Sequence, residues 1–119
     1  MTNSSLESIN SLPDVFYVAG QDEVFEFIVY DSYGAVQNIT GATCSWKLFP
    51  LGQTGNSSAV VLSLSGVITD APNGKWTVTI PGSNTLSLYG AYQQVPRVTD
   101  FSGTRFFPAM GIVNIQANS

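Results

Sequence analysis

Four acidic residues near the start of the chain form its only concentration of groups suited to acid–base chemistry. They are Asp22, Glu23, Glu26 and Asp31. A glycosidase needs two carboxyl groups held about 5 to 10 Å apart across a cleft. Glu23 and Glu26 lie in a segment that alternates as a β-strand does, with their side chains on opposite faces. We therefore interpret these groups as solvated acids of a strand and its turns.

The residue inventory excludes several other kinds of site. The 119 residues include no His and one Cys. This composition excludes a catalytic imidazole and a Ser-His-Asp triad, which need His. It also excludes a structural zinc site, which needs several Cys or His ligands, and an internal disulfide, which needs two Cys. Asp31 and Asp100 each give their loop one carboxylate, whereas a calcium site takes several oxygens from one loop. We expect no enzymatic activity, no cofactor and no metal.

Basic residues are few and do not cluster along the sequence. The chain has eight acidic residues and four basic ones, which gives a net charge of −4. The basic residues are Lys47, Lys75, Arg97 and Arg105. We therefore expect no nucleic-acid partner. The sequence has no apolar run long enough to span a membrane and does not open on a signal peptide, so we expect synthesis and folding in the cytoplasm. A free Cys44 fits that reducing compartment.

Neutral and aromatic side chains dominate the expected surface. Charged residues make up only 10% of the chain, and such a surface suits a protein that packs against other chains. Tyr17, Tyr30, Tyr33, Tyr89 and Phe101 are expected to be exposed. They fit a carbohydrate-stacking platform, ordinary cross-strand packing or a subunit interface, and the sequence does not decide among the three.

Two segments carry candidate interface residues. In the segment 105–108, consecutive Phe side chains point to opposite faces of a strand, so one of them faces outward. A bulge at Pro108 that turns both inward is the alternative. Residues 1–14 are polar with apolar residues three apart, which fits a short helical turn or a tail that becomes ordered on contact. Because Arg and Phe are enriched at interfaces, the candidate interface residues are Leu6, Ile9, Leu12, Arg105, Phe106 and Phe107.

The remaining pattern is that of short strands, and no segment has helical periodicity. Turn signals occur about every 8 to 12 residues, as in a sandwich. We predict an all-β chain of seven to nine strands, an antiparallel β-sandwich over residues 15–116 with an arm at 1–14 and a tail at 117–119. Pro96 lacks an amide donor and should lie at a sheet edge or a bulge. The expected strands are 15–18, 23–30, 43–49, 59–64, 67–69, 75–80, 91–99 and 104–116.

The same alternation selects the expected core. Trp46 and Trp76 should fill it from facing sheets. Gly34 and Gly41 supply backbone conformations that other residues resist. Tyr92 follows a turn glycine and should bond its hydroxyl to the backbone, as in a tyrosine corner. The expected core and turn residues are Phe25, Phe27, Gly34, Ile39, Gly41, Trp46, Trp76, Val78 and Tyr92.

The order of turns and strands carries a more specific resemblance. The segment Asp31–Leu48 runs through an Asp-x-x-Gly turn and an Ile-Thr-Gly-Ala corner into a strand. It resembles the Ig-like N-terminal domain of phage baseplate upper proteins and Ig-like phage decoration proteins, which implies an Ig-like antiparallel β-sandwich. The likeness covers roughly residues 15–116 and continues through Asn73-Gly74, Ile80-Pro81, Tyr89-Gly90-Ala91-Tyr92, Asp100-x-x-Gly103 and Gly111-Ile112-Val113.

The resemblance implies a structural protein of a tailed-phage virion, made in the host cytoplasm. We expect a capsid decoration (cement) protein, because the chain is short and carries no appended receptor-binding module. It would attach to the major capsid protein through a sandwich face and its N-terminal arm, which reaches about 45 Å when extended. We also expect it to form a homo-oligomer within the assembly. The alternatives are a tail or baseplate adaptor, bound to tail proteins, and a carbohydrate-binding module for host adhesion.

Overall fold

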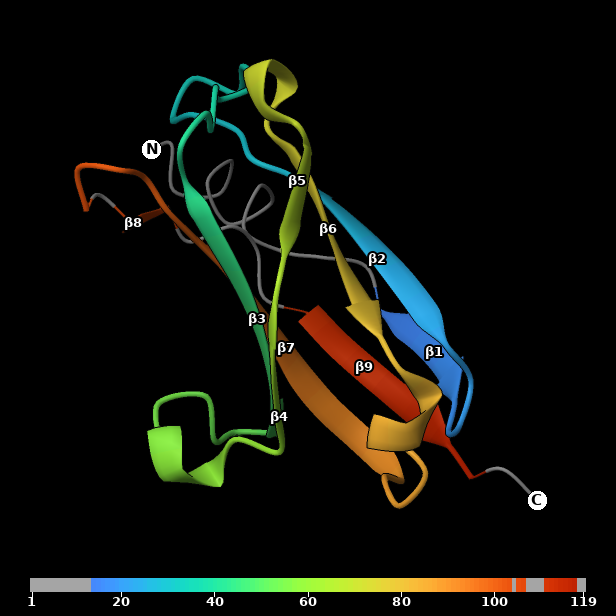
Figure 1. Cartoon of the computed structure of the whole chain (residues 1–119). Helices are drawn as coiled ribbons and strands as arrows, with labels where there is room; N and C mark the ends of the chain where they lie inside the picture. Colours follow the sequence, from blue (N-terminus) through green and yellow to red (C-terminus); the bar gives the residue numbers. More distant parts are fainter. Residues whose placement is uncertain (1–13, 104, 107–110, 118–119) are drawn as a thin grey trace.

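Two β-sheets pack face to face in the computed structural model, which describes residues 14–103, 105–106 and 111–117 (Figure 1). Three short 3-10 turns connect strands: η1 (Ser57–Ala59), η2 (Ala71–Asn73) and η3 (Gly82–Asn84). The strands are β1 (Val15–Val18), β2 (Glu23–Ile28), β3 (Thr43–Pro50), β4 (Leu62–Ser65), β5 (Val67–Asp70), β6 (Lys75–Ile80), β7 (Gly90–Thr99), β8 (Arg105–Phe106) and β9 (Gly111–Gln116).

The strand order is that of an immunoglobulin domain. One sheet has the order β1-β9-β7-β3-β4, with β8 paired to β7, and the other has the order β2-β6-β5. All strand pairs are antiparallel except β1 with β9, which is parallel. The order β2-β6-β5 against β9-β7-β3-β4 corresponds to strands B-E-D against G-F-C-C′ of the immunoglobulin sandwich. The predicted Ig-like, all-β sandwich of seven to nine strands is confirmed.

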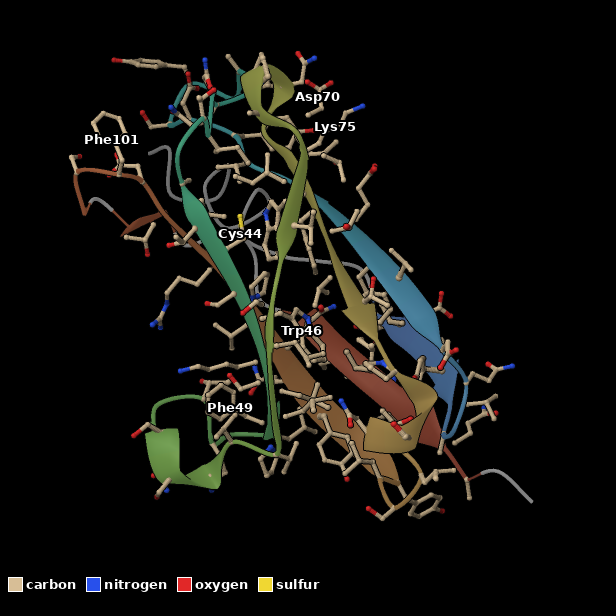
Figure 2. All side chains as sticks on the ribbon, viewed as in Figure 1. Cys44, Trp46, Phe49, Asp70, Lys75 and Phe101 are labelled. Atoms are coloured by element: carbon tan, nitrogen blue, oxygen red, sulfur yellow. The ribbon has the colours of Figure 1, made fainter. Side chains whose placement is uncertain are left out.

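The core fills the space between the two sheets. Alternation along β3 turns Cys44, Trp46 and Leu48 inward, because successive side chains of a strand point to opposite faces. From the other sheet, Phe27 and Trp76 stack with ring centroids 4.7 Å apart. The two indoles therefore fill the core from facing sheets, and Figure 2 shows Trp46 between the layers.

The inner face of β3 and β7 carries a buried hydrogen bond. The indole Nε1–H of Trp46 donates to Oε1 of Gln94 at 2.8 Å. Phe25 of β2 meets the same indole edge-on, with centroids 6.0 Å apart. In antibody domains, the Trp of strand C packs against a disulfide between strands B and F. Here Phe25 and Gln94 surround that Trp, and the single Cys44 is a free thiol on β3.

Turns at both ends of the sandwich follow the expected residues. The hydroxyl of Tyr92 donates to the carbonyl of Tyr89 and accepts from its N–H, both at 3.2 Å, which is a tyrosine-corner bond. Gly34 and Gly41 have φ of +86° and +79°, where a side chain would be strained. Ile39 lies between them in the sequence and is buried in the core.

The sheet pairing corrects the expectation for Tyr17 and decides between the two alternatives for Pro96. Tyr17 was expected at the surface but is buried, because alternation along β1 sends Phe16 outward and Tyr17 inward to the hydroxyl of Thr85. Pro96 does not lie at an edge, since β7 is an inner strand with continuous register to β3, but the register on the other side of β7 shifts by one residue across Pro96, as at a bulge. On the other side of β7, pairing to β9 ends at Gln94 and pairing to β8 begins at Val98, so the missing amide falls between two ladders.

The expected strand boundaries hold best where turn residues flank them. The segment 75–80 forms β6 with the expected bounds, whereas 59–64 contributes only its end to β4, because Ala59 belongs to η1. The segment 104–116 forms β8 and β9.

Candidate functional site

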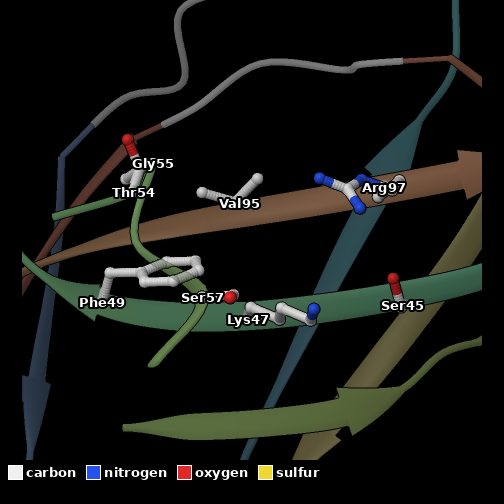
Figure 3. A pocket seen from close by; sticks show the side chains of 8 residues that line it. All are labelled: Ser45, Lys47, Phe49, Thr54, Gly55, Ser57, Val95 and Arg97. Atoms are coloured by element: carbon white, nitrogen blue, oxygen red, sulfur yellow. The ribbon is translucent and has the colours of Figure 1, made fainter. Parts of the chain in front are cut away.

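A hollow on the outer face of β3 and β7 is the candidate site of this chain (Figure 3). Alternation that buries Trp46 and Leu48 turns Ser45, Lys47 and Phe49 to the opposite face. The loop that follows β3 returns over this face and forms a wall. The hollow has a volume of about 300 Å³ and is lined by Ser45, Lys47, Phe49, Thr54, Gly55, Ser57, Val95 and Arg97.

The wall of the hollow is held by hydrogen bonds within the loop. The carboxamide oxygen of Asn56 accepts from the N–H of Ser58 at 3.1 Å and from its hydroxyl at 2.6 Å. The N–H of Gly52 donates to Oε1 of Gln93 at 3.1 Å, which ties the loop to β7. Phe49 is only 4% exposed although it points away from the core, because this loop covers it. The chain's own hydrogen bonds therefore hold this loop in place.

The lining of the hollow includes two basic side chains. Lys47 and Arg97 are two of the four basic residues in a chain of net charge −4, and no carboxylate of the described residues lines the hollow. Lys47 lies opposite Val95 in the β3–β7 register, and Arg97 is two residues further along β7. Such diagonal neighbours lie about 7–8 Å apart, so the register brings two basic residues to one face of the sheet.

Sequence reasoning missed this pair because the two residues lie fifty positions apart. Alternation alone places both on outward faces of their strands. Only the register of β3 with β7, where Ser45 pairs with Arg97, makes them neighbours.

The carboxylates of residues 22–31 serve turns rather than a cleft. The Asp22 carboxylate accepts from the N–H of Gly82 at 2.7 Å. The Asp31 carboxylate accepts from the N–H groups of Tyr33 and Ala35 at 2.8 and 3.0 Å. The described residues hold no group of three or more Cys, Asp or Glu side chains placed for a metal ion.

The predicted surface aromatic residues that are exposed are divided between the two ends of the sandwich. Tyr30, Tyr33, Tyr89 and Phe101 are exposed, whereas Tyr17 is not. The segments 30–42 and 100–103 lie at one end, and the segment 82–90 lies at the other (Figure 1). These side chains therefore do not form one continuous platform.

Most of the expected interface residues lie outside the part of the chain that the structure describes. These are Leu6, Ile9, Leu12 and Phe107. The backbone of Arg105 and Phe106 forms β8, paired with Thr99 and Val98.

Burial determines the reactivity of Cys44. The thiol faces the core beside Trp76, and burial raises its pKa from 9.0 to about 11. The thiolate is the reactive form, so this group is inert in the folded chain.

Comparison with known proteins gives a likeness at the level of structure. No family model and no curated protein sequence matches the chain. The fold is similar to part of a family 123 glycoside hydrolase from Clostridium perfringens, which hydrolyses glycolipid glycans. The match has 13% identity and a TM-score of 0.36, and it covers 92% of this chain and 23% of that one. This chain thus spans about a quarter of that enzyme's length, and the likeness says nothing about activity. No helix among the described residues is long and apolar enough to cross a membrane.

Proposed function

We propose that this chain is a non-enzymatic structural protein of a tailed-phage virion, which decorates the capsid by docking on capsid subunits. The observation that carries the proposal is the exposure of aromatic side chains at one end of the sandwich. Tyr33 is 94% exposed and Phe101 is 86% exposed. Aromatic side chains are enriched at the centres of protein interfaces, where burial in a partner's pocket stabilises the complex.

Both aromatic side chains stand on turns with fixed backbones. Tyr33 follows Asp31, whose carboxylate accepts from its N–H at 2.8 Å. Phe101 follows Asp100, whose carboxylate accepts from the N–H and the hydroxyl of Ser102 at 3.0 and 2.8 Å. A turn that is already ordered loses less conformational entropy on docking. The two side chains are therefore presented for contact rather than left on free loops.

The surroundings of this end suit a broad contact. Two aromatic side chains cover only part of the roughly 800 Å² that each partner buries in a stable interface. The rest must come from neighbouring side chains, which at this end include Asp31 and Asp100 of the two turns. The virion setting rests on the resemblance of Asp31–Leu48 and the later turns to Ig-like phage domains.

Association with intact particles tests the proposal. We expect the chain to sediment with purified virions of the phage that encodes it, in hundreds of copies per particle. A handful of copies would instead locate it in the tail and overturn the capsid assignment. Absence from intact virions would overturn the virion role altogether.

Substitution of the aromatic end tests the docking surface. The double variant Tyr33→Ser/Phe101→Ser should keep the circular dichroism spectrum of the sandwich and lose particle association. Tyr89→Ser is the matched control, because Tyr89 is 73% exposed at the opposite end. Loss of association in the control variant alone would contradict the assignment of this end. Removal of residues 1–14 measures the contribution of the arm in the same assay.

A further inference from the structure

We infer that strand β4 of this chain pairs edge to edge with β4 of a second copy, so that the larger sheets of the two copies continue into each other. β4 lies at one end of the larger sheet, and no other strand of the described residues pairs with its outer side. It begins beside the η1 loop, at the opposite end of the sheet from the turn 100–103 (Figure 1). The inference therefore depends neither on the aromatic end nor on the role in the virion.

The backbone of β4 directs two residues away from β3. The N–H of Gly66 donates to the carbonyl of Cys44 at 2.8 Å, and along an antiparallel pair the residues that bond to the partner strand alternate with residues that do not. Ser63 and Ser65 are the alternate residues, so their N–H and C=O groups point outward from the sheet. Both residues are exposed. Such a row of unpaired backbone groups is a template for another strand.

No charge, proline or bulge lies within this edge. Natural proteins use such features to keep sheet edges from pairing with other chains. The smaller sheet has them on both sides, since β2 carries the exposed Glu23 and Glu26 and β5 shifts its register after Ile68. β4 instead has the sequence Leu-Ser-Leu-Ser, in continuous register with β3. A second strand can therefore approach β4 without meeting a charge or a steric block on it.

The strand is complementary to itself, which favours a second copy as its partner. In an antiparallel pair with a two-fold axis at Leu64, Ser63 of each copy lies opposite Ser65 of the other. Each of these pairs then exchanges backbone hydrogen bonds in both directions, and their hydroxyl side chains face each other. The two Leu64 side chains, each partly buried against its own core, meet at the axis on the inner face. The same arrangement of two β2 strands about Glu26 would oppose like charges, which is unfavourable.

The contact is small, which determines how it should be measured. β4 has four residues, about 13 Å of strand, whereas each partner in a stable complex buries about 800 Å². Association should therefore be weak in dilute solution and stronger where copies are concentrated on one surface. A covalent trap detects such a pair without the need for high affinity.

Disulfide trapping tests the pairing and its register. Ser63 and the opposite Ser65 should have Cα atoms about 5.5 Å apart, which a disulfide spans. The two copies of Ser63 are diagonal neighbours about 7–8 Å apart, which a disulfide does not span. An equimolar mixture of Ser63→Cys and Ser65→Cys in oxidised glutathione should therefore form linked dimers about tenfold faster than either variant alone, as measured by non-reducing electrophoresis. Cys44 does not compete, because it is buried.

Cysteines on β5 are the matched control. Val67→Cys and Thr69→Cys have the same spacing and are exposed, but they lie outside the paired segment, so their mixture should link no faster than either variant alone. Labelling one variant of each mixture with ¹⁵N identifies the mixed dimers by mass, and circular dichroism verifies that every variant keeps the sandwich. Equal rates for the β4 mixture and its separate variants would overturn the register about Leu64. Equal rates for the β4 and β5 mixtures would overturn the pairing itself.

Discussion

Removal of the acceptor at Gln94 should destabilise the fold by far more than the same change one residue earlier in β7. Trp46 and Gln94 are 1% and 2% exposed, and their hydrogen bond is 2.8 Å long. In the variant Gln94→Leu, the indole N–H keeps its burial and loses its acceptor. A buried donor without a partner costs about 1–3 kcal/mol.

The expected loss of about 1–3 kcal/mol can be compared with the free energy of unfolding of the whole domain. A chain of this length is typically stable by about 6–18 kcal/mol, so the loss is a substantial fraction. It should lower the melting temperature by about 3–6 °C per kcal/mol. Gln93→Leu is the matched control, because Gln93 faces outward and its hydrogen bond with Gly52 is exposed to solvent. We expect the control to change stability by about 0.5 kcal/mol or less.

A double-mutant cycle isolates the hydrogen bond from the packing of the two side chains. Urea unfolding followed by far-UV circular dichroism gives the free energy of unfolding for Gln94→Leu, Trp46→Phe and the double variant. Once Trp46 is replaced by Phe, the acceptor has no indole donor to satisfy, so the second change should cost less. We expect a coupling energy of about 1 kcal/mol or more. Additivity within about 0.3–0.5 kcal/mol would refute the reasoning.

Three further predictions follow from the core and its edges. Gly66→Ala should destabilise the fold by about 1–3 kcal/mol, because a Cβ there would clash with the ring of Trp76 and would lie 2.9 Å from Cβ of Cys44. Gly55→Ala is its control in the same urea assay and should be neutral, since nothing lies within 4 Å of that position. Cys44 should react with iodoacetamide at pH 8 about a hundredfold more slowly than in urea, because burial raises its pKa from 9.0 to about 11. Because folding favours the neutral thiol, the contribution of Cys44 to the free energy of unfolding is complete below about pH 9 and is lost as the pH rises to 11. Between these pH values Cys44→Ala should lose less stability than the unaltered chain does, and equal losses would contradict the prediction. Tyr92→Phe should cost about 1 kcal/mol in urea unfolding, through loss of the backbone bonds of its hydroxyl, and a value near zero would show that the corner does not stabilise the fold.

Local patterns predict the strands of this chain well where the signals are dense. Strand β6 alternates between buried and more exposed residues from Lys75 to Ile80, and Gly74 and Pro81 stop it at both ends. Every feature that defines this strand is therefore within reach of a short window of sequence. Tyr17 shows the opposite case, since β1 has only four residues and its composition does not say which face is inward.

The candidate site could not be predicted in the same way. Alternation along the strands, or the composition of the loop, predicts that each residue lining the hollow lies at the surface. Their proximity to one another depends instead on how distant strands pair. A strand pair separated by about forty residues of chain has many registers open to it, and the choice is made by the packing of the whole core. The sequence therefore identifies Lys47 and Arg97 as outward residues without identifying them as neighbours.

The core hydrogen bond and the hollow depend on the same register of β3 with β7. Trp46 lies opposite Pro96, and its indole reaches diagonally to Gln94 on the inner face. On the outer face, Lys47 lies opposite Val95 and reaches diagonally toward Arg97. A slip of β3 by one residue against β7 would turn Lys47 into the core and the indole of Trp46 outward, because side chains alternate with period two. The buried bond thus discriminates against the register that would destroy the hollow, and a polar contact inside the sandwich specifies the arrangement of the charged residues outside it.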